Sequence, residues 1–344
     1  MLELCRAFAH NGDAVTLITL AATSSDFYRA PDGVDRIALD VLRETHSLPS
    51  ALQATWVRVR RLREAIVRAR PDVVLSFMDR TNVLVLLATR ATGIPVIAAE
   101  RNNPWLLPIG RLWELLRRVT YGWAAAITVQ AEETRSFFPS ALRRSVVVIP
   151  NAVAPAAPSN EARTQTVLAA GRLEPQKGFD VLIRAFERAG TLVPGWTLRI
   201  VGEGSQRGAL ESLRTSLGGA AFAIELPGRT TAMPVEYARA GIFVLSSRFE
   251  GFPNVLCEAM AHGCAVIATR CRSGPAEIVR DGVDGVLVPV DNVEALTDAL
   301  VALMQDADRR HALGTRATSI PQRYPTAGIT QNWIRVLDNA VRQR

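Results

Sequence analysis

The chain has 344 residues, of which 48% are hydrophobic and 21% charged. This length suits about two domains with cores of their own, and the composition excludes a disordered or fibrous protein. No apolar run approaches the roughly 18 residues that span a bilayer, and the N-terminus lacks the basic-then-apolar order of a secretory signal, so a cytoplasmic protein is expected.

The 40 basic residues outnumber the 33 acidic ones, which gives a net charge of +7. This excess fits nucleic acid, a membrane surface or an anionic substrate equally well, so it selects no partner. The kind of basic residue is more specific, because Lys177 is the single Lys and every other basic residue is Arg. Lys carries a compact ammonium where Arg carries a wide planar fork, so this position is expected to need Lys. The alternative is that Lys177 has no special role and remains by chance in a sequence whose codon bias favours Arg.

The first half of the chain alternates between β-type and helical patterns. Helices are predicted at 1–11, 52–69, 81–90 and 112–123. Strands are predicted at 14–20, 37–41, 72–77, 95–99, 125–129 and 146–149. Such alternation predicts an α/β domain with a parallel, doubly wound sheet over residues 1–150.

The start of this domain departs from the usual order. A doubly wound domain begins with a strand and a Gly-rich turn that lead into the first helix, whereas here the helix comes first. A first strand is central in such a sheet, and its loss would leave several backbone groups unpaired on both neighbours, at about 1–3 kcal/mol each. We therefore expect Met1 to be an internal Met and the start to lie about 20–35 codons upstream, enough for one strand and a turn. An in-frame stop directly before Met1 would contradict this expectation.

The second half repeats the alternation after a linker. Residues 151–165 are rich in Ala, Pro, Ser and Asn, which is typical of a linker. Strands are predicted at 167–170, 198–201, 221–226, 242–245, 265–268 and 285–288, with a helix at 179–189 and a mostly helical tail from 293. We expect a second α/β domain over 166–325 and a final helix within 326–344.

The stretch 246–269 contains a strand end, a loop, a helix and the next strand, with one carboxylate in the loop and one in the helix. Free N–H groups at the start of that helix favour an anion or a cluster of hydroxyls. Glu258 lies more than one turn into the helix and can accept hydrogen bonds from a diol. The ordinary alternative is that Glu258 is a solvated helix residue and Glu250 a loop charge.

Two cations follow the strand at 167–170. Arg172 and Lys177 bracket four residues at the carboxyl end of this strand, where open α/β sheets bind their ligands. Two positive charges there can hold a diphosphate and neutralise the charge that develops as it leaves. The alternative is an ordinary charged loop between a strand and a helix.

The segments GRLEPQKGFDVLIRAF (171–186) and EGFPNVLCE (250–258) resemble two motifs of glycosyltransferase family 4, R-x4-K and E-x7-E. The resemblance implies the GT-B fold, in which two doubly wound Rossmann-like domains face a cleft and the last helix returns to the first domain. It also implies transfer of a sugar from a nucleotide-sugar donor with retention of configuration. Neither a metal nor a cofactor is expected, because the nucleotide sugar is a substrate.

The resemblance assigns a role to each matching residue. Glu250, Arg172 and Lys177 are the implied catalytic residues. The implied donor contacts are Arg172 and Lys177 for the diphosphate, Glu258 for the ribose, Glu250, Gly251, Phe252, Pro253 and Asn254 for the sugar, and Gly228 and Arg229 for the base.

On the acceptor side, the loop that begins with Glu100 and Arg101 resembles an ERN-type loop in some bacterial members. The acceptor implied by family habit is a lipid-linked glycan or a polysaccharide of the cell envelope, and nucleic acid is not an expected partner. The predicted helix 112–123 combines Trp, Leu and Arg, which suits peripheral contact with an anionic membrane; ordinary packing explains the same pattern.

Three other functions remain open. A sugar-nucleotide epimerase shares the architecture but needs His and acids in its cleft, and this chain has only four His. An oxidoreductase needs G-x-G-x-x-G, whereas the third Gly after Gly202 and Gly204 is Gly208, one residue late. A non-catalytic partner subunit that binds the donor is the third alternative, and donor hydrolysis separates it from an enzyme.

Overall fold

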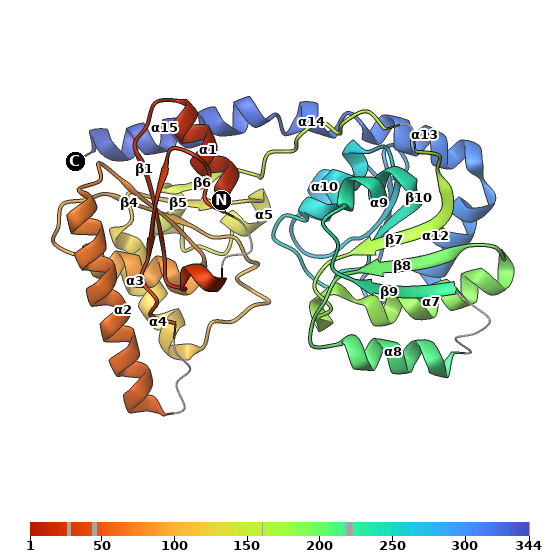
Figure 1. The fold of residues 1–344 in the computed structure, drawn as a ribbon, viewed down its shortest axis with the longest axis horizontal. Coiled ribbons are helices and arrows are strands. Elements are labelled where there is room, and N and C mark those ends of the chain that lie inside the picture. Colours follow the sequence, from red (N-terminus) through yellow and green to blue (C-terminus); the bar gives the residue numbers. More distant parts are fainter. Residues whose placement is uncertain (26–28, 43–46, 160, 218–222, 344) are drawn as a thin grey trace. The chain divides into compact units, whose positions relative to one another are not determined.

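The computed structural model describes residues 1–25, 29–42, 47–159, 161–217 and 223–343 (Figure 1). The chain forms two compact units. Unit 1 consists of Met1–Val129, Arg135–Ile149 and Thr330–Arg344, and unit 2 of Gln130–Thr134 and Pro150–Ile329. The predicted linker 151–165 therefore belongs to unit 2, and residues from 330 onward are grouped with unit 1.

Unit 1 contains two parallel sheets. Strands β1 (Val15–Thr19) and β2 (Val34–Ala38) form one, and the other has the order β3-β4-β5-β6. The strands of this second sheet are β3 (Val74–Phe77), β4 (Val96–Ala99), β5 (Ala126–Val129) and β6 (Val146–Val148). Among the described residues, β1 and β3 make no backbone pairing with each other. The prediction about codons before Met1 stays a prediction.

The predicted parallel α/β arrangement of unit 1 is confirmed, with one shifted strand. The second strand was predicted at 37–41, but β2 begins at Val34, where Val34 pairs with Val15. The turn before it is made by Gly33, whose φ of 77° is open mainly to glycine. Strand pairing therefore starts directly after that turn, three residues earlier than the apolar run at 37–41 suggests.

Helices pack against both sheets of unit 1, the first against β1 and β2 and the third against β3 and β4. They are α1 (Leu2–His10), α2 (Leu48–Ala69), α3 (Asp79–Thr89), α4 (Arg111–Thr120) and α6 (Ser140–Arg143), with short 3-10 turns η1 (Thr23–Ser25) and η2 (Tyr121–Trp123). Helix α5 (Glu132–Arg135) is divided between the two units after Thr134. Helix α2 begins one turn before its predicted start because the Ser47 side chain caps its first backbone N–H groups. Helix α3 contacts both α2 and α4 and is buried along most of its length.

Unit 2 has one parallel sheet of six strands in the order β12-β11-β10-β7-β8-β9. They are β7 (Thr164–Ala170), β8 (Thr197–Val201), β9 (Ala223–Gly228), β10 (Ala240–Leu245), β11 (Ala265–Thr269) and β12 (Val286–Val288). The first two residues of the predicted strand 221–226 lie outside the described residues. From β7 the chain builds outward to β8 and β9, then returns to add β10 on the other side of β7, so the strand order reverses between β7 and β10.

Both faces of the sheet in unit 2 are covered by helices (Figure 1). The helices of unit 2 are η3 (Pro175–Lys177), α7 (Phe179–Leu192), α8 (Arg207–Ser216), α9 (Met233–Arg239), α10 (Asn254–Ala261), α11 (Pro275–Ile278), α12 (Val293–Gln305), α13 (Ala307–Ala317) and α14 (Ile320–Arg323). The last helix, α15 (Thr326–Arg342), belongs to unit 1 from Thr330 onward. Alternate strand residues supply the two cores: Val167 packs in the cluster that contains α7 and α12, and Leu168 in the cluster that contains α10. Strands buried on both faces explain the continuous apolar runs in the sequence.

Candidate functional site

The strand-order reversal brings together two loops that lie far apart in the sequence. The loop after β7 carries Lys177, and the loop after β10 carries Glu250. Lys177 Nζ donates to Glu250 Oε1 at 2.7 Å, and the two side chains are only 14% and 7% exposed. Ser247 Oγ donates to the same oxygen at 2.6 Å. Parallel sheets bind ligands at such reversal points, so this pair is the core of the candidate site.

Three further hydrogen bonds join the two loops. Ser246 Oγ donates to Lys177 O at 2.8 Å, and Gln176 Nε2 donates to Phe249 O at 2.9 Å. The backbone N–H of Arg248 donates to Gln176 O at 2.8 Å. The two predicted motifs therefore form one interlocked structure.

Arg172, the other predicted phosphate-binding cation, lies on the same loop. Its side chain is exposed, and the described residues offer it no ion-pair partner. The site thus presents one open cation and one cation paired with a carboxylate. Together they suit an anionic group that carries more than one negative charge.

The loops after β7, β8 and β9 pack against one another through their backbones. Gly202 has a φ of 149°, and a Cβ there would collide with Gly171 O. Gly202 N donates to Gly228 O at 2.8 Å, and Leu173 N donates to Glu203 O at 2.9 Å. These contacts leave no room for a side chain at residue 202, so the predicted base-binding segment at Gly228 rests on a rigid backbone platform.

The segment after Glu250 leads directly into α10. Pro253 precedes the helix as its N-cap residue, and Asn254 is the first helical residue. Asn254 Oδ1 accepts a hydrogen bond from Asn151 Nδ2 at 2.7 Å, and Phe252 packs edge-on against Tyr324. The side chains of Phe252 and Asn254 therefore hold the start of α10 in place, and the backbone N–H groups of its first turn lie at this end of the helix.

Ser273 lies two residues before Pro275 and four before Glu277, a spacing typical of a helix N-cap, but it does not cap the helix that follows. Helix α11 begins at Pro275, and Gly274 is its N-cap residue. Ser273 Oγ instead donates to Glu250 O at 3.0 Å. The hydroxyl thus supports the loop that carries the predicted sugar-binding carboxylate, a contact between residues 23 positions apart.

Glu258 lies on the exposed side of α10 and has a partner that no motif indicates. The Tyr237 hydroxyl donates to Glu258 Oε2 at 2.9 Å. Burial and the adjacent Glu258 carboxylate raise the pKa of Tyr237, so its proton stays available for this bond. Tyr237 belongs to α9, a helix that is not among the predicted elements. Only a prediction of that helix would have indicated Tyr237 as a partner of Glu258.

The predicted acceptor-side residue Glu100 lies at the end of β4 in unit 1, and its side chain is 1% exposed. The Tyr121 hydroxyl donates to Glu100 Oε1, and Arg117 Nη1 lies 3.6 Å from the same oxygen. Burial raises the pKa of Glu100 to about 7, against the opposing effects of Tyr121 and Arg117. The structure thus gives Glu100 partners within unit 1, and its acceptor-side role stays a prediction.

Arg101 is committed to packing within unit 1. Its guanidinium carbon lies 4.9 Å from the centre of the Phe77 ring and 5.4 Å from that of Trp333. Removal from water lowers the pKa of Arg101 to about 10, which leaves it cationic at neutral pH. Trp333 is fully buried and belongs to α15, so Arg101 helps to fasten this helix to β3 and β4.

Glu100 gives a testable pH dependence. A carboxyl whose pKa is about 7 in the folded chain, against 4.5 for an ordinary Glu, stabilises the fold below pH 4.5 and loses that contribution as the pH rises through 7. The loss amounts to about 3 kcal/mol. Glu100→Gln should therefore raise the melting temperature relative to wild type more at pH 8 than at pH 5. Glu64→Gln, on exposed α2, is the control; an equal shift from Glu100→Gln at both pH values would contradict the prediction.

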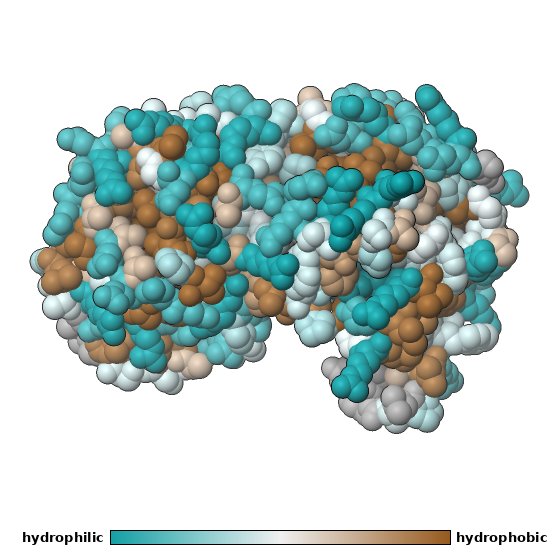
Figure 2. All heavy atoms as spheres, turned by 180° about the vertical axis from the view of Figure 1, so that it is seen from behind, coloured by the Kyte–Doolittle hydropathy of each residue, from teal (hydrophilic) through white to brown (hydrophobic). Residues whose placement is uncertain are grey.

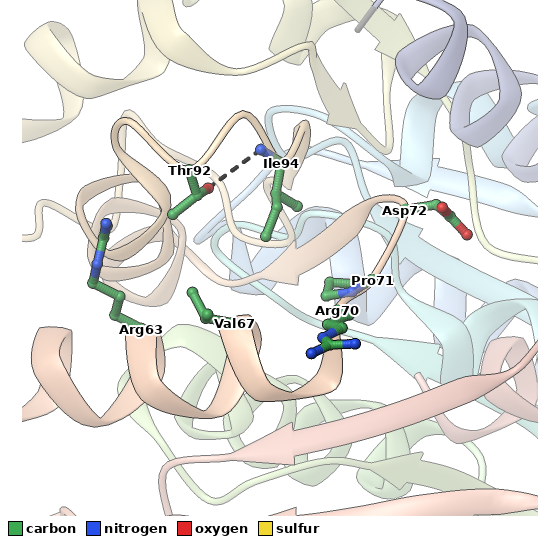
Figure 3. Close-up of a pocket in the computed structure, with 7 residues that line it drawn as sticks. All are labelled: Arg63, Val67, Arg70, Pro71, Asp72, Thr92 and Ile94. Carbon is green, nitrogen blue, oxygen red and sulfur yellow. Dashed lines mark hydrogen bonds between the residues drawn. The ribbon is translucent and has the colours of Figure 1, made fainter.

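An open depression of about 480 Å³ in unit 1 contains none of the predicted site residues (Figure 3). It is lined by Arg63, Val67, Arg70, Pro71, Asp72, Thr92 and Ile94. Arg63 donates to the carbonyls of Ala88 and Arg90, and the N–H of Ile94 donates to Thr92 Oγ1 at 3.2 Å. These polar groups join the ends of α2 and α3, which accounts for them without a ligand.

Helix α4 has an apolar and basic outer face. Leu112, Leu115 and Val119 are more than half exposed, at 55%, 59% and 53%. Arg111 and Arg118 are exposed on the same helix. On the molecular face seen from behind the view of Figure 1, apolar and hydrophilic residues lie side by side over the surface as a whole (Figure 2). Among the described residues, no helix combines the length and apolar content that a bilayer crossing needs.

Both halves of the chain match known families. Residues 164–306 match the family described as Glycosyl transferases group 1, and residues 1–152 match Glycosyl transferase 4-like domain. Together the two matches cover most of the chain.

Individual relatives agree with these matches. The amylovoran biosynthesis glycosyltransferase AmsD of Erwinia amylovora is 30% identical over 78% of this chain and 78% of its own length. An α-1,4-N-acetyl-D-galactosaminyltransferase of Campylobacter jejuni, named for a glycan linked to undecaprenol diphosphate, is 26% identical over 94% of this chain and 89% of its own. An exopolysaccharide phosphotransferase of Streptomyces coelicolor is 35% identical over 64% of this chain, and the chain spans about a quarter (24%) of that relative.

Among solved structures, Anabaena HepE in complex with UDP and glucose superposes with a TM-score of 0.80, over 98% of this chain and 95% of its own, at 19% identity. At 19% identity, this structural similarity shows the fold alone. The predicted GT-B class is confirmed by such structural neighbours.

Proposed function

The chain belongs to the family of group 1 glycosyl transferases, and we propose that it moves a sugar, with retention, from a nucleotide-sugar donor to a lipid-linked or polysaccharide acceptor in envelope glycan synthesis. The observation that carries this proposal is the Lys177–Glu250 pair at the strand-order reversal of unit 2, next to the exposed Arg172. The names of the relatives from Erwinia and Campylobacter support the acceptor class. The UDP in the HepE structure makes UDP-sugars the first donors to test.

In the proposed mechanism the bond between the anomeric carbon and the diphosphate oxygen breaks while the acceptor oxygen bonds to the same face of that carbon. Arg172 and Lys177 stabilise the charge on the departing diphosphate, which takes up the proton of the acceptor hydroxyl. No metal has a role in this scheme. Lys177, largely buried and held by Glu250, and the exposed Arg172 supply the stabilisation that the leaving group needs.

The remaining donor contacts follow from the arrangement of α10. Glu250 and the backbone N–H groups of Gly251, Phe252 and Asn254 position the sugar at the start of this helix, next to Pro253, which has no N–H. Glu258 accepts the hydroxyls of the ribose, with Tyr237 holding one of its oxygens in place. Gly228 and Arg229 at the end of β9 contact the base. Tyr237 thus supports the donor site although it does not touch the donor.

The test is turnover of a nucleotide-sugar panel, starting with radiolabelled UDP- and GDP-hexoses and polyprenyl diphosphate-linked acceptors. Sugar transfer, or slow hydrolysis of the donor without an acceptor, supports the proposal. Donor binding without either reaction favours the non-catalytic partner subunit. Conversion of the donor sugar to its epimer, with the nucleotide still attached, favours the epimerase.

We also propose that a cytoplasmic protein of this kind rests peripherally on an anionic membrane surface through α4. The apolar side chains of its outer face suit the interface, and Arg111 and Arg118 suit anionic headgroups. Removing a Leu of this size from the interface costs about 2 kcal/mol, so Leu115→Asp should weaken binding at least tenfold.

Sedimentation with phosphatidylcholine vesicles, with and without phosphatidylglycerol, measures this effect. Leu52→Asp on α2 is the matched control, because Leu52 is 62% exposed and Leu115 59%. Equal vesicle binding by wild type and Leu115→Asp, or an equal loss in the control, would rule out α4 as the contact.

A further inference from the structure

We propose that Arg248 is a positioning residue for the donor diphosphate, acting through Lys177. This inference rests on the proposed function, because it assumes that Lys177 binds the diphosphate. Arg248 lies between the two motifs in space but belongs to neither pattern. Its guanidinium holds the loop with Lys177 against the loop with Glu250.

The Arg248 side chain joins three segments of unit 2. Two of its nitrogens donate to the two carboxylate oxygens of Asp180 at 3.0 and 2.8 Å, in the first turn of α7. Its Nε lies 2.8 Å from Asp291 Oδ1, in the segment between β12 and α12. Nη1 also donates to Pro175 O at 2.5 Å, at the start of η3. All of its nitrogens are engaged, and a bidentate contact of this kind fixes direction as well as distance.

The backbone next to Arg248 carries the restraint to both predicted site residues. The N–H of Arg248 donates to Gln176 O at 2.8 Å, one residue before Lys177. Gln176 Nε2 returns a bond to Phe249 O at 2.9 Å, one residue before Glu250. A shift of η3 therefore moves Lys177 Nζ relative to Glu250. Displacements of less than 1 Å are enough to weaken a charged contact of this kind.

Simple surface pairing does not account for this arrangement. Exposed ion pairs join two side chains and contribute little. The Asp180 and Asp291 side chains are 47% and 51% exposed, but the Arg248 side chain is 28% exposed and binds both carboxylates and a backbone carbonyl at once. The Asp180 carboxylate is partly buried, and despite this burial the hydrogen bonds and charge of Arg248 lower its pKa. Both observations indicate a fixed geometry at the base of η3.

The test is calorimetric binding of UDP, or of GDP if wild type binds only GDP, to Arg248→Met. We expect affinity about tenfold weaker than in wild type. In the Lys177→Ala background the same substitution should have almost no effect, because Arg248 acts through Lys177. Asp291→Asn, which loosens one of the three contacts, should weaken binding less and keeps the test open if Arg248→Met folds poorly. Arg270→Met is the matched control, since Arg270 follows β11 and pairs with Asp281 at 3.0 Å.

Each outcome supports or overturns the positioning role of Arg248 or the proposed function. Wild-type affinity in both Arg248→Met and Asp291→Asn, or a tenfold loss that persists in the Lys177→Ala background, would overturn the positioning role while leaving the proposed function intact. A chain that binds the nucleotide in the expected pattern but transfers no sugar would overturn the proposed function and keep the inference. Failure of wild type to bind either nucleotide would overturn both.

Discussion

Lys177→Ala is expected to weaken the binding of UDP, or of whichever nucleoside diphosphate wild type binds, by about 1.5–3 kcal/mol, the range for a hydrogen bond to a charged group. The Lys177 ammonium is largely buried and lies at the carboxyl end of β7, where a diphosphate would carry at least two negative charges. The substitution also leaves the Glu250 carboxylate without its cation, which adds repulsion toward an anionic ligand. Isothermal calorimetry measures the loss.

Two further variants separate this effect from general damage. Lys177→Arg should recover only part of the affinity, because the Lys177 stem lies against Gly171 and a planar fork does not replace a point charge there. Arg172→Ala should weaken binding less than Lys177→Ala, because the Arg172 side chain is exposed to solvent screening. Full affinity in Lys177→Ala would remove the phosphate role from this residue.

Glu250→Gln is expected to slow sugar transfer by about 100-fold while leaving the dissociation constant of the nucleoside diphosphate nearly unchanged. The Gln carbonyl still accepts from Lys177 and Ser247, so the site keeps its shape. What is lost is the negative charge that orients the sugar hydroxyls next to the anomeric carbon. Steady-state kinetics with the donor identified by the nucleotide-sugar panel measures the rate.

Glu258→Gln is the matched control, because it should weaken binding of the nucleoside diphosphate, the property that Glu250→Gln leaves nearly unchanged. In the proposed site the Glu258 carboxylate binds the ribose, with one oxygen held by Tyr237, so the variant should bind the free nucleoside diphosphate several-fold more weakly. If both variants change the affinity for the sugarless nucleotide to the same extent, the division of roles between the two carboxylates is wrong.

Much of the local structure follows from sequence pattern alone. The buried strands β4 and β10 are expected as short apolar runs, and α7 as a helix at 179–189. Each depends on interactions within a few residues, which a pattern records. The errors have a physical origin too. Strand β2 begins where Gly33 completes a turn, and α9 is a seven-residue helix too short to show a clear period.

The candidate site shows where pattern reasoning stops. The residue types and spacings near Lys177 and Glu250 were visible in the chain, and a local motif sufficed to single them out. That they meet at 2.7 Å depends on β10 adding beside β7, a decision made by the sheet as a whole. The supporting side chains of Ser273 and Tyr237 belong to no motif, because their partners lie more than 20 residues away.

Sequence by itself therefore determined the α/β alternation and the two-part division of the chain, and it singled out the cations and carboxylates proposed for the donor side, because periodicity, composition and spacing record these features. Tertiary structure alone decided that Glu100 is buried beside Tyr121 and Arg117 and that Arg101 stacks on Trp333. Both residues follow a strand, as Arg172 and Glu250 do, and nothing in their neighbours along the chain sets them apart. Burial is a property of what packs around a side chain, and those groups come from α4, η2 and α15, which only the folded chain brings together.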